Sequence, residues 1–151
     1  MGLETMADVV TLVAILACTL FAGAAVYINL VEHPARLSCG TEIAARQWAP
    51  SYKRATVMQA SLAIVAGFAG VFRWLQSGHV LWLCGAAAIL AVVPVTLLVI
   101  FPTNKRLLEP GRNLGSDETR ALLVAWGRLH AIRSVLSMIG SVLFILAGTH
   151  D

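Results

Sequence analysis

Four long apolar runs divide this sequence, and each is long enough to cross a lipid bilayer. They cover residues 9–31, 55–72, 80–101 and 122–148. A transmembrane helix needs about 20 apolar residues, because the hydrocarbon core is about 30 Å thick. Inside that core each backbone N–H and C=O group must find its partner within the protein, which favours helices. The sequence therefore predicts an all-α integral membrane four-helix bundle, with residues 1–151 forming a single domain.

The composition excludes an ordinary water-soluble protein. Apolar residues make up 58% of the chain and charged residues 13%, whereas about 25% of an average soluble domain is charged. The net charge of +3 does not indicate nucleic-acid binding, since the basic residues are interleaved with acidic ones beside the apolar runs. The three cysteines have no C-x-x-C spacing, which argues against a disulfide framework or a thiol redox relay.

The lysines and arginines predict the orientation in the membrane. All except Arg73 lie within two regions, residues 36–54 and 105–133. Basic residues near short loops resist translocation and stay on the cytoplasmic side. We therefore expect a multi-pass protein of the plasma (inner) membrane, with cytoplasmic polar loops and both termini extracytoplasmic.

Two prolines and a serine are expected to shape the helices. Pro94 interrupts the third run and should bend its helix. Pro34 disfavours helical geometry at the residue before it, and should bend or end the first helix there. Ser116 has the side chain of an N-cap, and the carboxylates of Asp117 and Glu118 suit the first turn of a helix. The fourth helix is therefore expected to begin before its apolar run and to project from the lipid.

Polar side chains gather at one end of the predicted bundle. The end of the first helix carries Asn29, Glu32, His33 and Arg36. Their offsets of three, four and seven place them on one face of a helix. Ionisable groups inside a membrane are costly unless paired or hydrated, so they are candidate functional groups. The alternative for Glu32 and His33 is a helix end in contact with water.

The second and third helices bring polar groups to the same level. Tyr52 and Gln59 lie seven residues apart and share a face. Gln59 can contact a substrate or form a hydrogen bond between helices. Trp48 is expected to anchor its helix at the membrane interface. Asn104 follows the third run and adds an amide at this level.

The fourth helix carries the sharpest pattern. Trp126, His130 and Arg133 lie at offsets of zero, four and seven, and they form an aromatic and cationic stripe that enters the membrane. Arg133 would be costly against lipid, so it is expected to point inward, toward Glu32 or toward an anionic substrate. The sequence therefore predicts a polar pocket at the cytoplasmic end, roofed by apolar helices.

A bound cofactor is one alternative at this pocket. Glu32, His33 and His130 have the side chains of a transition-metal site, although no helix carries an H-x-x-x-H pair. His33 and His130 are also candidate axial ligands of a haem. The third alternative is a pocket that requires no cofactor.

Short polar and aromatic elements follow one another in a definite order along the chain. They are Val31-Glu32-His33-Pro34-Ala35-Arg36, Trp48 with Tyr52 and Arg54, Met58-Gln59, Pro102-Thr103-Asn104, and Trp126 with His130 and Arg133. In this order, and placed against four apolar runs, they resemble the small four-helix membrane proteins of the anthrone-oxygenase-like family. The resemblance spans nearly the whole chain.

The resemblance implies an activity. Characterised members oxidise anthrones to anthraquinones in polyketide pathways, a monooxygenase reaction at the methylene between two aromatic rings. A base would remove a proton from that carbon, and a cation would stabilise the enolate before it reacts with dioxygen. On this hypothesis His130 or His33 is the base, and Arg133 and Arg54 hold the oxyanion.

The same hypothesis assigns roles to the other polar and aromatic residues. Glu32 orients a histidine, and Tyr52 and Trp126 stack on the flat substrate. The expected substrate contacts are Arg36, Trp48, Tyr52, Arg54, Gln59, Asn104 and Trp126.

Two other classes of protein fit the same pocket. A binding or carrier module would hold a hydrophobic anion or quinone without reaction, and a structural protein would use the polar groups only for stability. The partners expected for an enzyme or a carrier are a hydrophobic aromatic small molecule and the lipid bilayer. Small residues such as Ala66 and Gly70 can support helix packing or a homo-oligomer.

Overall fold

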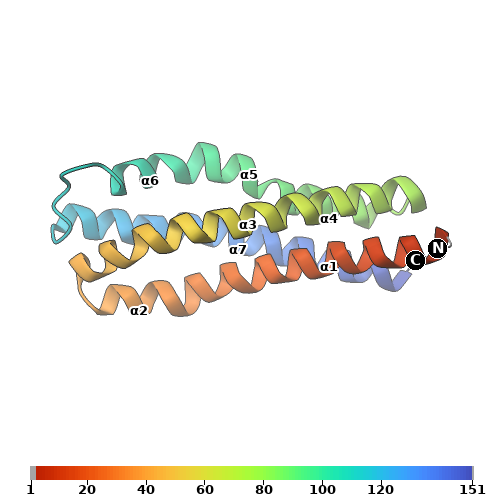
Figure 1. The fold of residues 1–151 in the computed structure, drawn as a ribbon, viewed down its shortest axis with the longest axis horizontal. Helices are drawn as coiled ribbons and strands as arrows, with labels where there is room; N and C mark the ends of the chain where they lie inside the picture. The colour runs from red at the N-terminus through yellow and green to blue at the C-terminus, as the bar shows by residue number, and fades with distance from the viewer. Residues whose placement is uncertain (1–2, 151) are drawn as a thin grey trace.

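The computed structural model describes residues 3–150, which form a bundle of four long helices that run up and down beside one another (Figure 1). The first helix consists of α1 (Leu3–Tyr27), the π-helical η1 (Ile28–Glu32) and α2 (His33–Ser38), and the second is α3 (Thr41–Ser77). The third consists of α4 (Val80–Leu90), α5 (Val92–Pro94), the π-helical η2 (Val95–Ile100) and α6 (Phe101–Leu107). The fourth is α7 (Asp117–His150).

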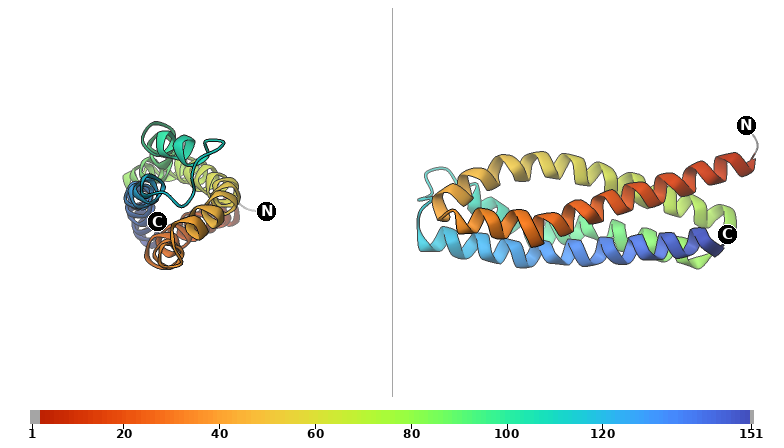
Figure 2. Two further views of the ribbon diagram at one scale, coloured as in Figure 1. Left: turned by 90° about the vertical axis from the view of Figure 1, so that its left-hand side faces the viewer. Right: turned by 90° about the horizontal axis from the view of Figure 1, so that it is seen from below.

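The four helices have the length and surface of membrane spans. All are long and apolar enough to cross a bilayer, and no strand occurs within residues 3–150. Leu30, Val57 and Leu98 are 73%, 71% and 75% exposed, so large apolar side chains face outward, as they do toward lipid. The two ends of the chain lie at the same end of the bundle, as Figures 1 and 2 show. The predicted all-α membrane bundle is confirmed.

Pro34 does not end the first helix, contrary to the sequence-based expectation. His33 has ordinary helical dihedral angles, and its N–H donates to the Ile28 carbonyl across a wide π-helical turn. The helix then continues to Ser38. A π-helical turn inserts one extra residue, which accommodates the proline that follows without a break.

The third helix is distorted where Pro94 predicted it. Pro94 has no N–H for the carbonyl of Leu90, and regular α-helical geometry is interrupted at Ala91 before the π-helical η2 begins at Val95. Figure 1 shows the helix changing course between α4 and α5. The part of the third helix that follows Pro94, η2 and α6, therefore does not continue along the axis of α4.

The start of α7 agrees with the sequence. The Ser116 hydroxyl oxygen accepts a hydrogen bond from the Thr119 N–H at 3.2 Å, which is the geometry of an N-cap. Asp117 and Glu118 occupy the first turn. The predicted cap is therefore confirmed.

Glycines let the helices approach closely in the half of the bundle near the termini. A Cβ added at Gly70 or Gly85 would lie 2.5 Å from the ring of Phe144. Phe144 is fully buried, with Trp82 against it at a ring-centroid distance of 5.5 Å. Gly70 therefore supports packing between helices of the same chain, one of the two roles that the sequence left open.

The opposite half of the bundle buries polar groups together with aromatic ones. Its apolar core includes Trp48, Trp126 and Leu123. The buried polar and charged side chains at this end include His33, Arg36, Gln59, Asn104, His130 and Arg133. Charged and amide side chains are costly to bury inside a membrane, and where they occur they usually mark a functional site. The candidate site therefore lies at this end.

Candidate active site

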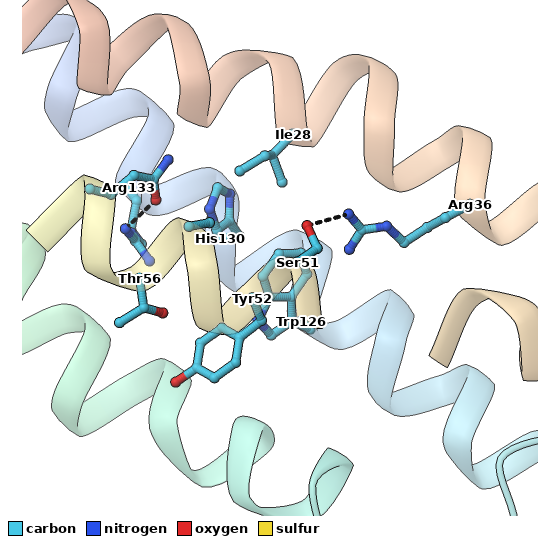
Figure 3. A pocket seen from close by; sticks show the side chains of 10 residues that line it. Ile28, Arg36, Ser51, Tyr52, Thr56, Trp126, His130 and Arg133 are labelled. Carbon is cyan, nitrogen blue, oxygen red and sulfur yellow. Dashed lines mark hydrogen bonds between the residues drawn. The ribbon is translucent and has the colours of Figure 1, made fainter. Parts of the chain in front are cut away.

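A small cavity opens among the first helix, α3 and α7 at the polar end of the bundle (Figure 3). Its volume is about 10 Å³, room for about one water molecule. The residues that line it are Ile28, Arg36, Ser51, Tyr52, Ala55, Thr56, Gln59, Trp126, His130 and Arg133. Residues from three helices that are far apart in the sequence therefore meet around one point.

A larger apolar chamber adjoins this cavity. It has a volume of about 140 Å³ and is lined by Phe21, Thr56, Gln59, Ala60, Ala63, Val92, Val93, Thr96, Leu97 and Arg133. The two cavities share Thr56, Gln59 and Arg133. The chamber is therefore mainly apolar, and it is polar only where Arg133 and the other shared residues separate it from the small cavity.

Arg133 points into the bundle, as predicted, and is 7% exposed. Its Nη2 donates to Gln59 Oε1 at 2.6 Å, and its guanidinium carbon lies 5.3 Å from the centre of the Phe21 ring. No carboxylate within residues 3–150 forms an ion pair with it. Arg133 is therefore a buried cation whose contacts are an amide and an aromatic ring.

Glu32 does not pair with Arg133, so the first of the two alternatives for Arg133 was wrong, and an anionic substrate stays a prediction. Its carboxylate accepts hydrogen bonds from Arg36, from Gln47 at 3.0 Å and from Ser51 at 3.0 Å. It therefore holds Arg36 at the cavity wall, and its hydrogen bonds go to no histidine.

His130 is 1% exposed and lies in the cavity wall. Its Nδ1 lies 2.7 Å from Asn29 Oδ1, and its ring packs 4.8 Å from that of Trp126. His130, one of the two histidines proposed as a base, therefore lies one turn from Arg133 on the same helix.

His33 is buried against the other side of α7. It is 4% exposed, so the alternative of a histidine in contact with water is wrong for this residue. Its Nε2 lies 2.9 Å from the Leu123 carbonyl oxygen, and its ring centre lies 5.0 Å from that of Trp126. His33 lies outside the cavity lining, whereas His130 is part of it.

The aromatic side chains pack on one another. Trp48 stacks on Tyr52 with 5.1 Å between ring centres and meets Trp126 edge-on at 5.7 Å. Trp48 is 1% exposed, so its expected role as an interface anchor was wrong. Tyr52 and Trp126 both line the cavity, which is the position that contact with a flat ligand requires.

Three predicted contact residues line neither cavity: Trp48, Arg54 and Asn104. Arg54 is exposed and lines a groove on the outer surface with Gln47 and Met58. Asn104 is fully buried, but it is not among the residues that line either cavity, and its amide has no hydrogen-bond partner within residues 3–150.

The residues predicted for a metal or a haem do not fit either group. Within the described part of the chain, no three His, Cys, Asp or Glu side chains lie close enough together to hold a metal ion. Glu32 is engaged by Arg36, and His33 Nε2 is engaged by the Leu123 carbonyl. The geometry therefore supports neither of these ligand sets.

Several buried N–H groups at this end have no hydrogen-bond partner within residues 3–150. They are Arg36 Nε, Trp48 Nε1, Gln59 Nε2, Asn104 Nδ2, Trp126 Nε1 and Arg133 Nε, against two acceptors that are unpartnered in the same range, His33 Nδ1 and Asn104 Oδ1. Buried donors normally find acceptors, so this end of the bundle carries an excess of donors. Such a site suits a ligand with carbonyl, enolate or phenolate oxygens.

Gly127 is a site residue that no sequence pattern indicated. Its carbonyl accepts a hydrogen bond from Asn29 Nδ2 at 2.8 Å. A Cβ at this position would lie 2.7 Å from the Cδ2 atom of His33. The missing side chain therefore lets the His33 ring lie directly against α7.

Gly127→Ala is expected to displace the His33 ring and to lower the free energy of unfolding by about 1–3 kcal/mol, the usual cost of overpacking. Thermal unfolding in detergent would measure the loss. Gly23→Ala is the matched control, because an added Cβ there meets no atom within 4 Å. Equal stability of Gly127→Ala and the wild type would contradict this tight contact.

Comparison with known proteins places the chain in one family. A family model described as anthrone oxygenase matches residues 48–143. The chain is similar to an anthrone oxygenase of Claviceps purpurea, with 29% identity over 89% of this chain and 85% of the relative. It is also similar to anthrone oxygenase AgnL2 of Paecilomyces divaricatus, with 30% identity over 90% of this chain and 93% of the relative.

A third relative has a higher sequence identity to this chain, over a shorter aligned region. Anthrone oxygenase tpcL of Aspergillus fumigatus is 44% identical over 38% of each chain. No solved structure matches the chain. The family model covers more than half of the sequence, including Trp126, His130 and Arg133, and the chain therefore belongs to the anthrone oxygenase family.

Proposed function

We propose that this protein is a membrane-bound monooxygenase that converts an anthrone-type substrate to the corresponding anthraquinone with dioxygen. The observation that carries the proposal is that His130 and Arg133 line the same cavity. The buried guanidinium there has no carboxylate partner within residues 3–150. A buried cation without an anion is unfavourable. An anion that forms during a reaction would supply the missing charge.

The reaction needs a base and a site for an oxyanion. His130 takes a proton from the methylene between the two aromatic rings, and the electron pair of the broken C–H bond moves onto the carbonyl oxygen as an enolate. Arg133 holds that oxygen, and the N–H groups at this end of the bundle add to its stabilisation. The carbon then reacts with dioxygen, and loss of water leaves the second carbonyl. In the balanced sum, a CH2 group and O2 become a C=O group and H2O.

The adjoining chamber suits the remainder of such a substrate. Its wall is mainly apolar, with Phe21, Ala63, Val92 and Leu97 among its residues, and Arg133 lies at the end that it shares with the polar cavity. A flat aromatic molecule would place its rings against the apolar wall and its oxygen at the polar end.

The direct test is oxygen consumption by purified protein in detergent with an anthrone as the probe. We expect one dioxygen consumed for each anthraquinone formed, followed by an oxygen electrode and by the quinone absorbance, at a rate well above that of anthrone alone. Saturable binding of the anthrone without added oxygen uptake would instead identify a carrier and would overturn the proposed reaction.

A further inference from the structure

We propose that Asn29 is a positioning residue that holds His130 in the tautomer protonated on Nδ1, so that the unprotonated Nε2 is the base. This inference rests on the proposed function for its role in the reaction. The arrangement of hydrogen bonds that carries it stands independently of the reaction.

The Asn29 amide has only one orientation that satisfies its neighbours. The Gly127 carbonyl oxygen can only accept a hydrogen bond, so the group that faces it at 2.8 Å must be the Nδ2 amide nitrogen. Oδ1 then faces away from Gly127, toward His130 Nδ1 and the Ser134 hydroxyl, each at 2.7 Å. The reversed amide would place two carbonyl oxygens against each other.

This orientation decides where the His130 proton lies. Asn29 Oδ1 can only accept, so His130 Nδ1 must carry the hydrogen. In the neutral ring Nε2 then has a free lone pair. No hydrogen bond within residues 3–150 involves His130 Nε2, and the ring lines the cavity (Figure 3). A free imidazole favours the opposite tautomer, so the protein imposes this one.

His33 has the opposite arrangement, for the same reason. Its Nε2 lies 2.9 Å from the Leu123 carbonyl oxygen, which can only accept, so His33 carries its hydrogen on Nε2. Its Nδ1 is buried without a partner among the described residues. The two histidines beside Trp126 therefore differ in tautomer, and only His130 is part of the cavity wall.

Asn29 reaches α7 from an unusual segment. It lies in η1, the π-helical turn directly before α2. Such turns are rare and occur often at functional sites, because they shift the side chains that follow out of the regular helical register. Asn29 thus lies in the segment of the first helix where α-helical spacing does not give the correct direction of the side chains.

The first test reads the tautomer directly by NMR. Protein with nitrogen-15-labelled histidine, in detergent at a pH where His130 is neutral, contains four histidines, and the His33→Ala and His130→Ala variants assign the two signals. We expect the His130 signal to show protonation on Nδ1 and the His33 signal to show protonation on Nε2. A His130 signal protonated on Nε2 would overturn the proposal.

The second test is the series Asn29→Ala and Asn29→Asp. Asn29→Ala is expected to lower kcat by about 10-fold or more while KM changes little, because the base is no longer held with Nε2 free. In Asn29→Asp a carboxylate beside His130 favours the protonated ring, so the acidic limb of the kcat profile should move to higher pH. A role limited to packing would leave His130 protonated on Nδ1 in Asn29→Ala, whereas loss of the acceptor should return the ring to protonation on Nε2.

Apart from the carboxylate that Asn29→Asp introduces, the charged and titratable groups around His130 are the same in each variant. They are Arg36 and His33 from the first helix, Tyr52 from α3, and Arg133 from α7. Ser134→Ala is the matched control, because it removes the other donor to Asn29 Oδ1 and keeps the bond to His130. It should leave the His130 tautomer and the acidic limb unchanged.

The two tests separate this inference from the proposed function. Failure to oxidise any anthrone, together with a His130 signal protonated on Nδ1, would overturn the proposed reaction and would support the proposal that Asn29 positions His130. An active enzyme that loses activity in His130→Ala, but whose acidic limb is the same in Asn29→Asp, would keep the reaction and remove the positioning role.

Discussion

His130→Ala is expected to lower kcat for anthrone oxidation by about 10²- to 10⁴-fold, the usual contribution of a positioned general base. The ring is 1% exposed in the cavity wall, with Nδ1 engaged by Asn29 and Nε2 free of hydrogen bonds within residues 3–150. No other histidine lines this cavity. Oxygen uptake and quinone absorbance under saturating anthrone would measure the change.

The control for this variant is His150→Ala, a replacement at the opposite end of α7, where His150 stacks on His79. It should keep the wild-type rate. Deuteration of the anthrone methylene adds a check on the mechanism. If proton transfer to His130 limits the rate, the wild-type enzyme should turn over the deuterated anthrone more slowly than the ordinary one. A fully active His130→Ala enzyme would show that another group removes the proton.

Arg133→Met is expected to separate activity from stability. Loss of the guanidinium should lower kcat by about 10²- to 10³-fold, as the loss of an oxyanion-stabilising group does. The free energy of unfolding should stay level or rise, because the buried cation has no carboxylate partner within residues 3–150 and is costly in the resting protein. Kinetics and thermal unfolding of the same preparations would test both expectations.

The matched control is Arg128→Met on the same helix, where the arginine is exposed. It should change neither kcat nor the thermal midpoint. If Arg133→Met unfolds at a much lower temperature than wild type, the guanidinium is a structural group, and its proposed role at the oxyanion fails. Arg133→Lys retains the charge and should recover part of the lost rate.

The helical architecture could be predicted because its signals are local. The apolar runs, the N-cap at Ser116 and the distortion at Pro94 each depend on a few neighbouring residues. The inward direction of Arg133 could also be predicted, because lipid excludes a guanidinium. The expected alternative that the first helix ends at Pro34 was wrong, since the π-helical η1 before it accommodates the proline without a break.

The partners within the site could not be predicted in the same way. Arg133 was expected to point toward Glu32 or toward an anionic substrate, and it donates a hydrogen bond to Gln59, 74 residues away in the sequence. Glu32 was expected to orient a histidine, but the side chain that contacts the His130 ring nitrogen belongs to Asn29, 101 residues away in the sequence. Gly127 carried no motif, and its importance appears only when the His33 ring lies against it.

The sequence by itself determined four membrane helices and the polar end at which the candidate site lies, because each follows from residue type and from spacing along one helix. The tertiary structure alone decided which polar groups meet. Spacing specifies the face that a side chain occupies on its own helix, whereas the rotation and depth of neighbouring helices depend on close packing at positions such as Gly85 against Phe144. That packing places Asn29, His130 and Arg133 around one cavity.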